Sequence, residues 1–128
     1  MNFGSGENVP KWTIKCSYRG KPGTRSGCKN WWCYDDFSYS GKGSISTVLH
    51  GNGRGKLDFG ICYWTSSSSS HKVKVYLNGN VISTAFGNNN DVNKVIEFDY
   101  HDGSTLKIEE ISGSVLQFNS FEVIKCYN

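Results

Sequence analysis

Proline is scarce in this chain, with two residues among 128, and no apolar run approaches the ~18 residues that a membrane-spanning helix needs. The formal net charge is only +3, and the lysines and arginines are scattered along the sequence. Neither feature is typical of a dedicated nucleic-acid-binding protein. The first six residues lack the apolar centre of a secretory signal, so we expect any such signal to have been removed.

Sequence motifs of catalysis and of metal binding are missing as well. The cysteines form no Cys-x-x-Cys pair and have no histidine at zinc spacing. There is no Gly-x-Ser-x-Gly elbow, no phosphate-binding glycine loop and no Asp-x-Asp-x-Asp-Gly calcium loop. A small glycosidase would need two facing carboxylates about 5–10 Å apart, and no such pair is evident. We therefore expect that the protein is not an enzyme.

Glycine and aromatic residues are abundant instead, with 15 glycines and 14% aromatic side chains. Glycine supplies turns, and aromatic residues favour strands. Apolar and polar residues alternate in one short segment after another, about 8–12 residues apart, and no stretch keeps a helical period. We predict a single domain over residues 1–128, an all-β antiparallel β-sandwich of about eight or nine strands.

A hairpin is expected at residues 71–86, where Asn78-Gly79 suits a two-residue type I′ turn. A second hairpin is expected at residues 95–111, with a three-residue loop at 102–104. The last strand, 115–126, needs a bulge near residues 119–120 to keep one face buried. The cross-strand pairs that these hairpins predict are Tyr76 with Val81, Val75 with Ile82, Val73 with Thr84, Tyr100 with Leu106, and Phe98 with Ile108.

Five cysteines in a small domain indicate an oxidising compartment and disulfide bonds. Because five is odd, we expect two intrachain bridges and one cysteine that is either buried or paired with another chain, which would give a homodimer. The sequence leaves the pairing open. The alternative is a reduced intracellular protein with buried thiols. The five residues are Cys16, Cys28, Cys33, Cys62 and Cys126.

One short stretch combines aromatic rings with carboxylates, namely Trp31, Trp32, Tyr34, Asp35 and Asp36. Sugars stack their C–H faces on aromatic rings, and their hydroxyls pair with convergent polar groups. In a strand, the two tryptophans point to opposite faces, so one belongs to the core and the other is partly exposed. The alternative interpretation is that the acids are simply solvated. We predict a carbohydrate site here.

A second oxygen-rich segment follows Gly87 and consists of Asn88, Asn89, Asn90 and Asp91. Such segments bind Ca²⁺ or saccharide hydroxyls, although Asn also occurs in ordinary turns because it tolerates a left-handed backbone. A calcium site would have to be assembled from distant loops. We expect Asp35, Asp36 and Asp91 as its ligands.

Several segments of the last two thirds of the chain carry a resemblance to a known architecture. They are Gly-Lys-Leu-Asp-Phe-Gly at 55–60, Val-Lys-Val-Tyr-Leu-Asn-Gly at 73–79, and the strands at 95–98, 103–108 and 118–123. In this order they resemble the galactose-binding-like jelly-roll sandwiches of many carbohydrate-binding modules and lectins. The chain is also similar to small secreted lectins of marine invertebrates such as sea anemones. The resemblance implies a β-sandwich lectin, often with Ca²⁺, whose loops at one end or edge contact the ligand.

We therefore expect a secreted lectin-type protein that recognises glycan hydroxyls, with galactose-type sugars favoured and Ca²⁺ as its candidate cofactor. Its expected partners are glycans, and neither nucleic acid nor a membrane span is expected. The alternative is an extracellular structural or adhesive domain that binds protein partners.

Overall fold

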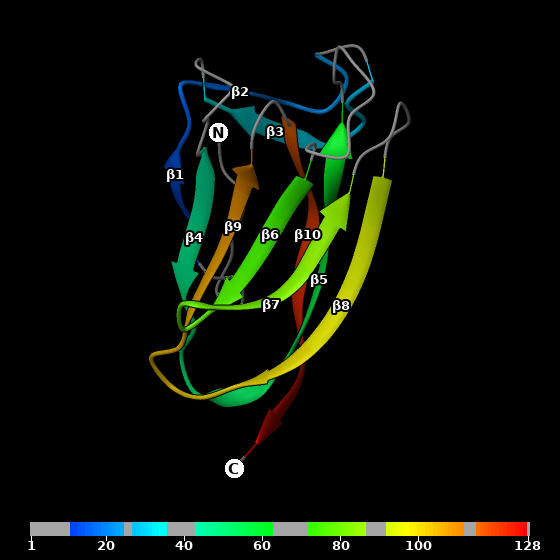
Figure 1. Cartoon of the computed structure of the whole chain (residues 1–128). Helices are drawn as coiled ribbons and strands as arrows, with labels where there is room; N and C mark the ends of the chain where they lie inside the picture. Colours follow the sequence, from blue (N-terminus) through cyan, green and yellow to red (C-terminus); the bar gives the residue numbers. More distant parts are fainter. Residues whose placement is uncertain are drawn as a thin grey trace.

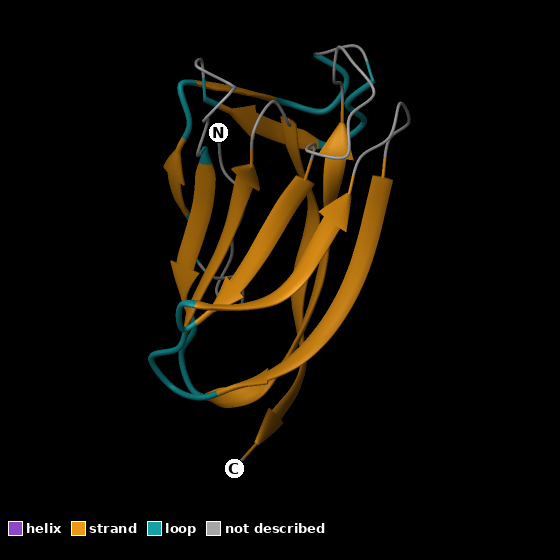
Figure 2. Cartoon of the chain, in the orientation of Figure 1, coloured by secondary structure: helices purple, strands orange, loops and turns teal. Residues whose placement is uncertain are grey.

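The computed structural model describes residues 11–24, 27–35, 43–62, 72–86, 92–111 and 115–127. These residues form ten strands and no helix (Figures 1 and 2). Within them, no helix that could span a membrane is found. The strands are β1 (Thr13–Lys15), β2 (Tyr18–Gly20), β3 (Trp31–Tyr34), β4 (Ser44–Val48), β5 (Asn52–Cys62), β6 (Lys72–Leu77), β7 (Asn80–Phe86), β8 (Val92–Tyr100), β9 (Thr105–Ile111) and β10 (Val115–Tyr127).

The strands form two five-stranded sheets. The first sheet has the order β1-β4-β9-β6-β7, and the second has the order β2-β3-β10-β5-β8. All strand pairs are antiparallel. The predicted antiparallel β-sandwich is therefore confirmed. The strand count exceeds the expected number because strands as short as the three-residue β2 are too brief to show an alternating pattern.

The core lies between the two sheets and follows the alternation in the sequence. On β5, the side chains of Leu57, Phe59 and Ile61 are fully buried, while the residues between them face outwards or are glycine. On β6, Val73 and Val75 are buried in the same way. Burial of each such side chain contributes about 1.5–3 kcal/mol. These alternating positions therefore hold the two sheets together.

The hairpin of β6 and β7 forms as expected. Asn78 and Gly79 have φ angles of 53° and 82°, as a type I′ turn requires. The turn places Tyr76 opposite Val81, as the sequence predicts.

Beyond this pair the predicted register is wrong. A bulge between Val75 and Tyr76 shifts the pairing by one residue, so that Val75 lies opposite Ser83 and Val73 opposite Ala85. The bulge turns these two small residues into the core and leaves Ile82 38% exposed. The turn sequence alone does not reveal the extra residue.

The second predicted hairpin is also wrong. Strand β8 pairs with β5 in the second sheet, whereas β9 lies between β4 and β6 in the first sheet. The connection through Gly103, with a φ of 86°, therefore crosses from one sheet to the other (Figure 1). Phe98 and Ile108 are both buried as expected, but from opposite sheets. Alternation places a side chain on a buried face and does not name the neighbouring strand.

The bulge predicted in the last strand is confirmed. The register between β10 and β5 shifts between Phe118 and Ser120. This shift leaves both Phe118 and Phe121 buried, although the two residues are three positions apart. The ring of Trp12 packs edge-on against both, with centroids 5.1 and 6.0 Å away.

Two disulfides and one free cysteine are present, as expected. Cys16 bonds to Cys33, which joins the end of β1 in the first sheet to β3 in the second. Cys28 bonds to Cys62 and ties the segment before β3 to the end of β5. Cys126 is free and exposed, so the expectation of a buried odd thiol is excluded. Each bridge typically contributes about 2–4 kcal/mol to stability.

Candidate functional site

The two tryptophans of β3 face opposite sides of the second sheet, as alternation predicts. Trp31 packs against the main core, and Trp32 is only 8% exposed on the other face. A Cβ atom added at Gly20 would lie 2.2 Å from Cζ2 of Trp32, so the indole covers this glycine closely. The indole Nε1 donates a hydrogen bond to Oγ1 of Thr24 at 3.1 Å. Trp32 is therefore the buried tryptophan and Trp31 is partly buried, and the roles of both in sugar binding stay predictions.

Tyr34 lies in the middle of a row of three aromatic rings on the outer face of the second sheet. Its ring stacks on Tyr18 with centroids 5.0 Å apart and planes at 18°, and on Trp32 at 6.0 Å and 21°. Tyr18 ends the row and is 43% exposed. Tyr18 was not predicted, because it belongs to the three-residue strand β2 and meets Tyr34 only through long-range pairing.

Asp35 follows β3 directly and is the next residue after Tyr34. The hydroxyl of Ser17 donates a hydrogen bond to Oδ1 of Asp35. An aromatic ring, a hydroxyl and a carboxylate therefore lie close together near the adjoining ends of β2 and β3. We call Ser17, Tyr18, Tyr34 and Asp35 the Tyr18–Asp35 site.

The buried carboxyl group of Glu110 holds the backbone of Asp35 in this site. Its Oε1 accepts hydrogen bonds from the backbone N–H of Asp35 and, at 3.2 Å, from that of Gly43. Its Oε2 is buried and has no hydrogen-bond partner among the described residues. Burial raises the pKa of Glu110 to about 7; the two backbone donors oppose this shift, and the nearby charge of Asp35 adds to it.

Sequence reasoning missed Glu110, although a signal was present. The alternation that buries Leu106 and Ile108 on β9 continues to position 110. A carboxyl group at an inward position is rare unless it is paired, so it marks a place of special chemistry.

The predicted calcium and saccharide ligands are only partly visible. Asp36, Asn88, Asn89, Asn90 and Asp91 lie outside the described residues, and their roles stay predictions. In the part of the chain that is described, no group of three or more His, Cys, Asp or Glu side chains is arranged to hold a metal. Among the predicted calcium ligands, Asp35 alone can therefore be placed, next to the unpredicted Glu110.

Next to the aromatic row, the same outer face carries a network of side-chain amides. Gln117 is 1% exposed; its Oε1 accepts from the backbone N–H groups of Asn30 and of the lysine before it, at 3.3 and 2.9 Å. Its Nε2 donates to Asn93 at 2.9 Å, and Asn119 donates to Asn93 and Asp58 at 2.9 and 2.8 Å. The network fastens the segment before β3 to the sheet.

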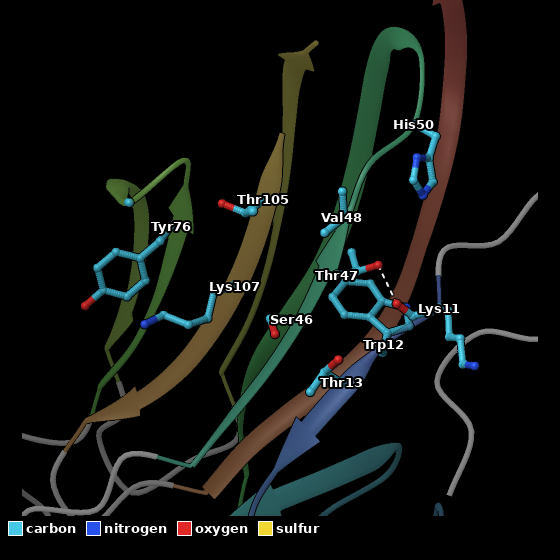
Figure 3. A pocket seen from close by; sticks show the side chains of 11 residues that line it. Lys11, Trp12, Thr13, Ser46, Thr47, Val48, His50, Tyr76, Thr105 and Lys107 are labelled. Atoms are coloured by element: carbon cyan, nitrogen blue, oxygen red, sulfur yellow. Dashed lines mark hydrogen bonds between the residues drawn. The ribbon is translucent and has the colours of Figure 1, made fainter. Parts of the chain in front are cut away.

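A hollow of about 600 Å³ lies on the opposite side of the molecule, on the outer face of the first sheet (Figure 3). Thr13, Ser46, Lys107 and Tyr76 lie opposite one another on neighbouring strands and cross the hollow in a row. At its far edge, the hydroxyl of Thr47 donates to the carbonyl oxygen of Lys11 at 2.6 Å. The hollow is thus lined by hydroxyl groups, ammonium groups and the rings of Tyr76, Trp12 and His50.

The ring of Tyr76 in this hollow lies next to two charged side chains, Lys107 and Glu109. The Nζ of Lys107 lies 4.9 Å from the ring centroid of Tyr76 and 3.2 Å from Oε2 of Glu109. The phenol oxygen of Tyr76 lies 3.5 Å from Oε1 of Glu109. Burial raises the pKa of Tyr76, and the charge of Glu109 adds to the shift. Tyr76 therefore stays a neutral phenol at ordinary pH.

The architecture of the two sheets defines the chain as a jelly-roll β-sandwich of the kind found in carbohydrate-binding modules. It is similar to a family 35 carbohydrate binding module from Clostridium thermocellum, with a TM-score of 0.52, 13% identity, and coverage of 88% of this chain and 91% of that chain. A family 35 module from an environmental isolate has a TM-score of 0.45, 15% identity and 99% coverage of both chains. Rabbit GITRL has a TM-score of 0.46, 10% identity, and coverage of 66% of this chain and 74% of that chain. No protein-family model and no curated protein matches the sequence.

Proposed function

We propose that this protein is a non-catalytic carbohydrate-binding protein and that the Tyr18–Asp35 site holds the sugar. The observation that carries the proposal is the ring of Tyr18, 43% exposed and stacked on Tyr34, at the strand ends where Ser17 donates a hydrogen bond to the carboxylate of Asp35. A ring face offers stacking to the C–H side of a sugar, and a carboxylate accepts hydrogen bonds from its hydroxyls. The fold shared with a carbohydrate binding module supports the same proposal.

Calcium is the proposed cofactor of this site. Ca²⁺ takes six to eight oxygen ligands, and carboxylates are its preferred charged ligands. The buried Oε2 of Glu110, which has no partner among the described residues, and the carboxylate of Asp35 would supply two of them. Asp36 and Asp91 stay predicted as further ligands. A bound cation would keep Glu110 ionised at neutral pH.

Secretion is proposed on the basis of the two disulfides, which persist in oxidising compartments. Galactose-type sugars are the ligands that we propose to test first.

A glycan array probed with the protein, in calcium and in EDTA, tests the proposal. We expect binding that EDTA weakens. Tyr18→Ala should then weaken the binding of the best glycan roughly three- to tenfold, since one aromatic contact is worth about 0.5–1.5 kcal/mol. The matched control is Tyr127→Ala, which removes a tyrosine of similar exposure, 39%, from the C-terminal strand. An array without binding, or equal losses in both variants, would contradict the proposal.

The exposed thiol of Cys126 favours a second candidate function, an adhesive domain that forms disulfide-linked homodimers. Non-reducing electrophoresis of the secreted protein separates the two cases, because a dimer that dissociates in reductant supports the adhesive function.

A further inference from the structure

The tertiary structure gathers some of the scattered lysines of the sequence on one surface. Five of them lie on the outer face of the first sheet or directly before it, because their neighbours in the alternating pattern, such as Val73 and Val75, point into the core. We call this surface the lysine face. Its lysines are Lys11, Lys15, Lys72, Lys74 and Lys107.

The charge of the lysine face is strongly one-sided. Among its described residues, Glu109 is the only carboxylate, so the face has four more positive than negative charges, whereas the whole chain has an excess of three. Glu109 lies opposite Lys74 in the sheet register and within 3.2 Å of Lys107. Its charge is therefore offset locally, and the face as a whole stays positive.

The other side of the sandwich differs in this respect. Arg54 is held by Glu97 and Asp99, each at 3.1 Å, and Lys56 lies opposite Glu97 and Glu122 in the register. The strands of the second sheet carry five cations and four carboxylates, so the excess of positive charge on them is one. A solvated surface needs charges only for solubility, so an excess of one sign on a single face indicates an oppositely charged ligand.

The strand register spaces the charges of the lysine face across the sheet. One row runs from Lys15 through Ser44 and Glu109 to Lys74, and the next row runs parallel to it from Thr13 to Tyr76 through the hollow. Neighbouring strands lie about 4.8 Å apart, and three such spacings separate the backbones of Lys15 and Lys74, which are therefore about 14 Å apart. This length suits several units of an extended polymer better than a single small anion.

The hydroxyl-bearing and aromatic side chains that lie between the lysines indicate the chemical class of the polymer. The hollow of about 600 Å³ presents the hydroxyl-bearing residues Thr13, Ser46 and Thr105 together with the rings of Tyr76, Trp12 and His50 (Figure 3). Hydroxyls beside an aromatic ring match a sugar chain, because the hydroxyls of a sugar pair with polar groups and its C–H faces stack on rings. We propose that the lysine face binds an anionic polysaccharide, with its sulfate or carboxylate groups on the lysines and its sugar rings along the hollow.

The lysine face lies on a different sheet from the Tyr18–Asp35 site, and its function does not depend on calcium. The two proposals can therefore fail separately. Tyr18→Ala and EDTA should leave binding at the lysine face unchanged, and loss of the lysines should leave calcium-dependent sugar binding unchanged.

Binding of dextran sulfate to the full chain, compared with unsulfated dextran of the same length, tests the proposal. We expect binding of the sulfated polymer alone, weakened by more than about tenfold between 50 and 200 mM salt as counterions are displaced. The triple variant Lys11→Gln, Lys15→Gln and Lys74→Gln should lose roughly tenfold or more in affinity. The ion pairs between described residues do not include these three lysines, so the substitutions break none of those ion pairs.

The matched control is the triple variant Lys29→Gln, Lys56→Gln and Lys125→Gln, which removes the same charge from elsewhere on the molecule. We expect it to lose less than about twofold. Equal losses in both variants would overturn the proposal, as would binding of double-stranded DNA at least as tight as that of dextran sulfate. If the first triple variant does not fold, lysine acetylation of the wild-type protein decides: dextran sulfate should protect Lys15 and Lys74 but not Lys56, and uniform protection would overturn the proposal.

Discussion

The carboxylate of Glu110 holds Asp35 in place through a hydrogen bond from the backbone N–H of Asp35 to Oε1. The two residues are 75 positions apart in the sequence and belong to strands of different sheets or their ends. A buried carboxyl group of β9 thus positions the residue that follows β3. The ionisation of Glu110 is therefore linked to the geometry of the Tyr18–Asp35 site.

The raised pKa of Glu110 predicts a pH-dependent stability. Its pKa rises from 4.5 in the unfolded chain to about 7 in the folded chain, so the folded state binds the proton more tightly. Below pH 4.5 the carboxyl group is protonated in both states. As pH rises from there through 7, the unfolded chain releases the proton first, so the free energy of unfolding falls. The full effect is about 3 kcal/mol.

Urea unfolding at pH 5 and pH 8.5 in EDTA measures this effect. The Glu110→Gln variant should lose most of this decline, whereas Glu109→Gln, which changes a half-buried neighbour, should keep it. The same pH dependence in the wild type and in Glu110→Gln would show that another group is responsible.

Calcium should stabilise the protein if Asp35 and Glu110 bind it. At a calcium concentration about a hundred times the dissociation constant, we expect a gain of about 2.7 kcal/mol and a rise in Tm of roughly 10 °C. Asp35→Asn should reduce this rise, because it removes a charged ligand. Asp102→Asn, at a turn where the carboxylate accepts from the backbone N–H of Gly51, is the control and should keep it. A Tm that does not respond to calcium argues against the metal site.

The state of the cysteines can be counted chemically. Iodoacetamide under denaturing conditions without reductant should modify one thiol per chain, at Cys126, and Cys126→Ser should leave none. Mass spectrometry of tryptic peptides checks both statements. Modification at Cys16 or Cys28 would show that the corresponding disulfide is absent.

The close packing of Trp32 on Gly20 predicts a sensitive position. A Cβ atom at residue 20 would lie 2.2 Å from the indole, so Gly20→Ala forces the ring to move and should cost about 1–3 kcal/mol. In a Trp32→Phe background, where the ring is smaller, the same change should cost less. Denaturant unfolding of the four proteins measures this coupling, and additive losses would mean that the two residues do not compete for space.

Local features of the chain were readable from the sequence. The Asn78-Gly79 turn, the alternation that buries Leu57 and Phe59, and the bulge near Asn119 each depend on a few consecutive residues. Turn geometry and strand alternation are short-range properties, so they survive without knowledge of the partner strand. The odd number of cysteines, with two bridges and one free thiol, also follows from counting.

Long-range pairing was decided only by the tertiary structure. It placed β8 and β9 in different sheets, brought Tyr18 against Tyr34, and gathered Lys15 and Lys74 onto one face. In each case the local pattern says that a side chain points inwards or outwards, and many partners satisfy that condition equally well. The sequence by itself determined most of the strands, the Asn78-Gly79 turn and the alternating buried residues of β5. The choice of neighbours, and with it both candidate binding surfaces, came from the way two sheets pack around one core, because only the packed arrangement makes one set of pairings compatible with all the buried residues at once.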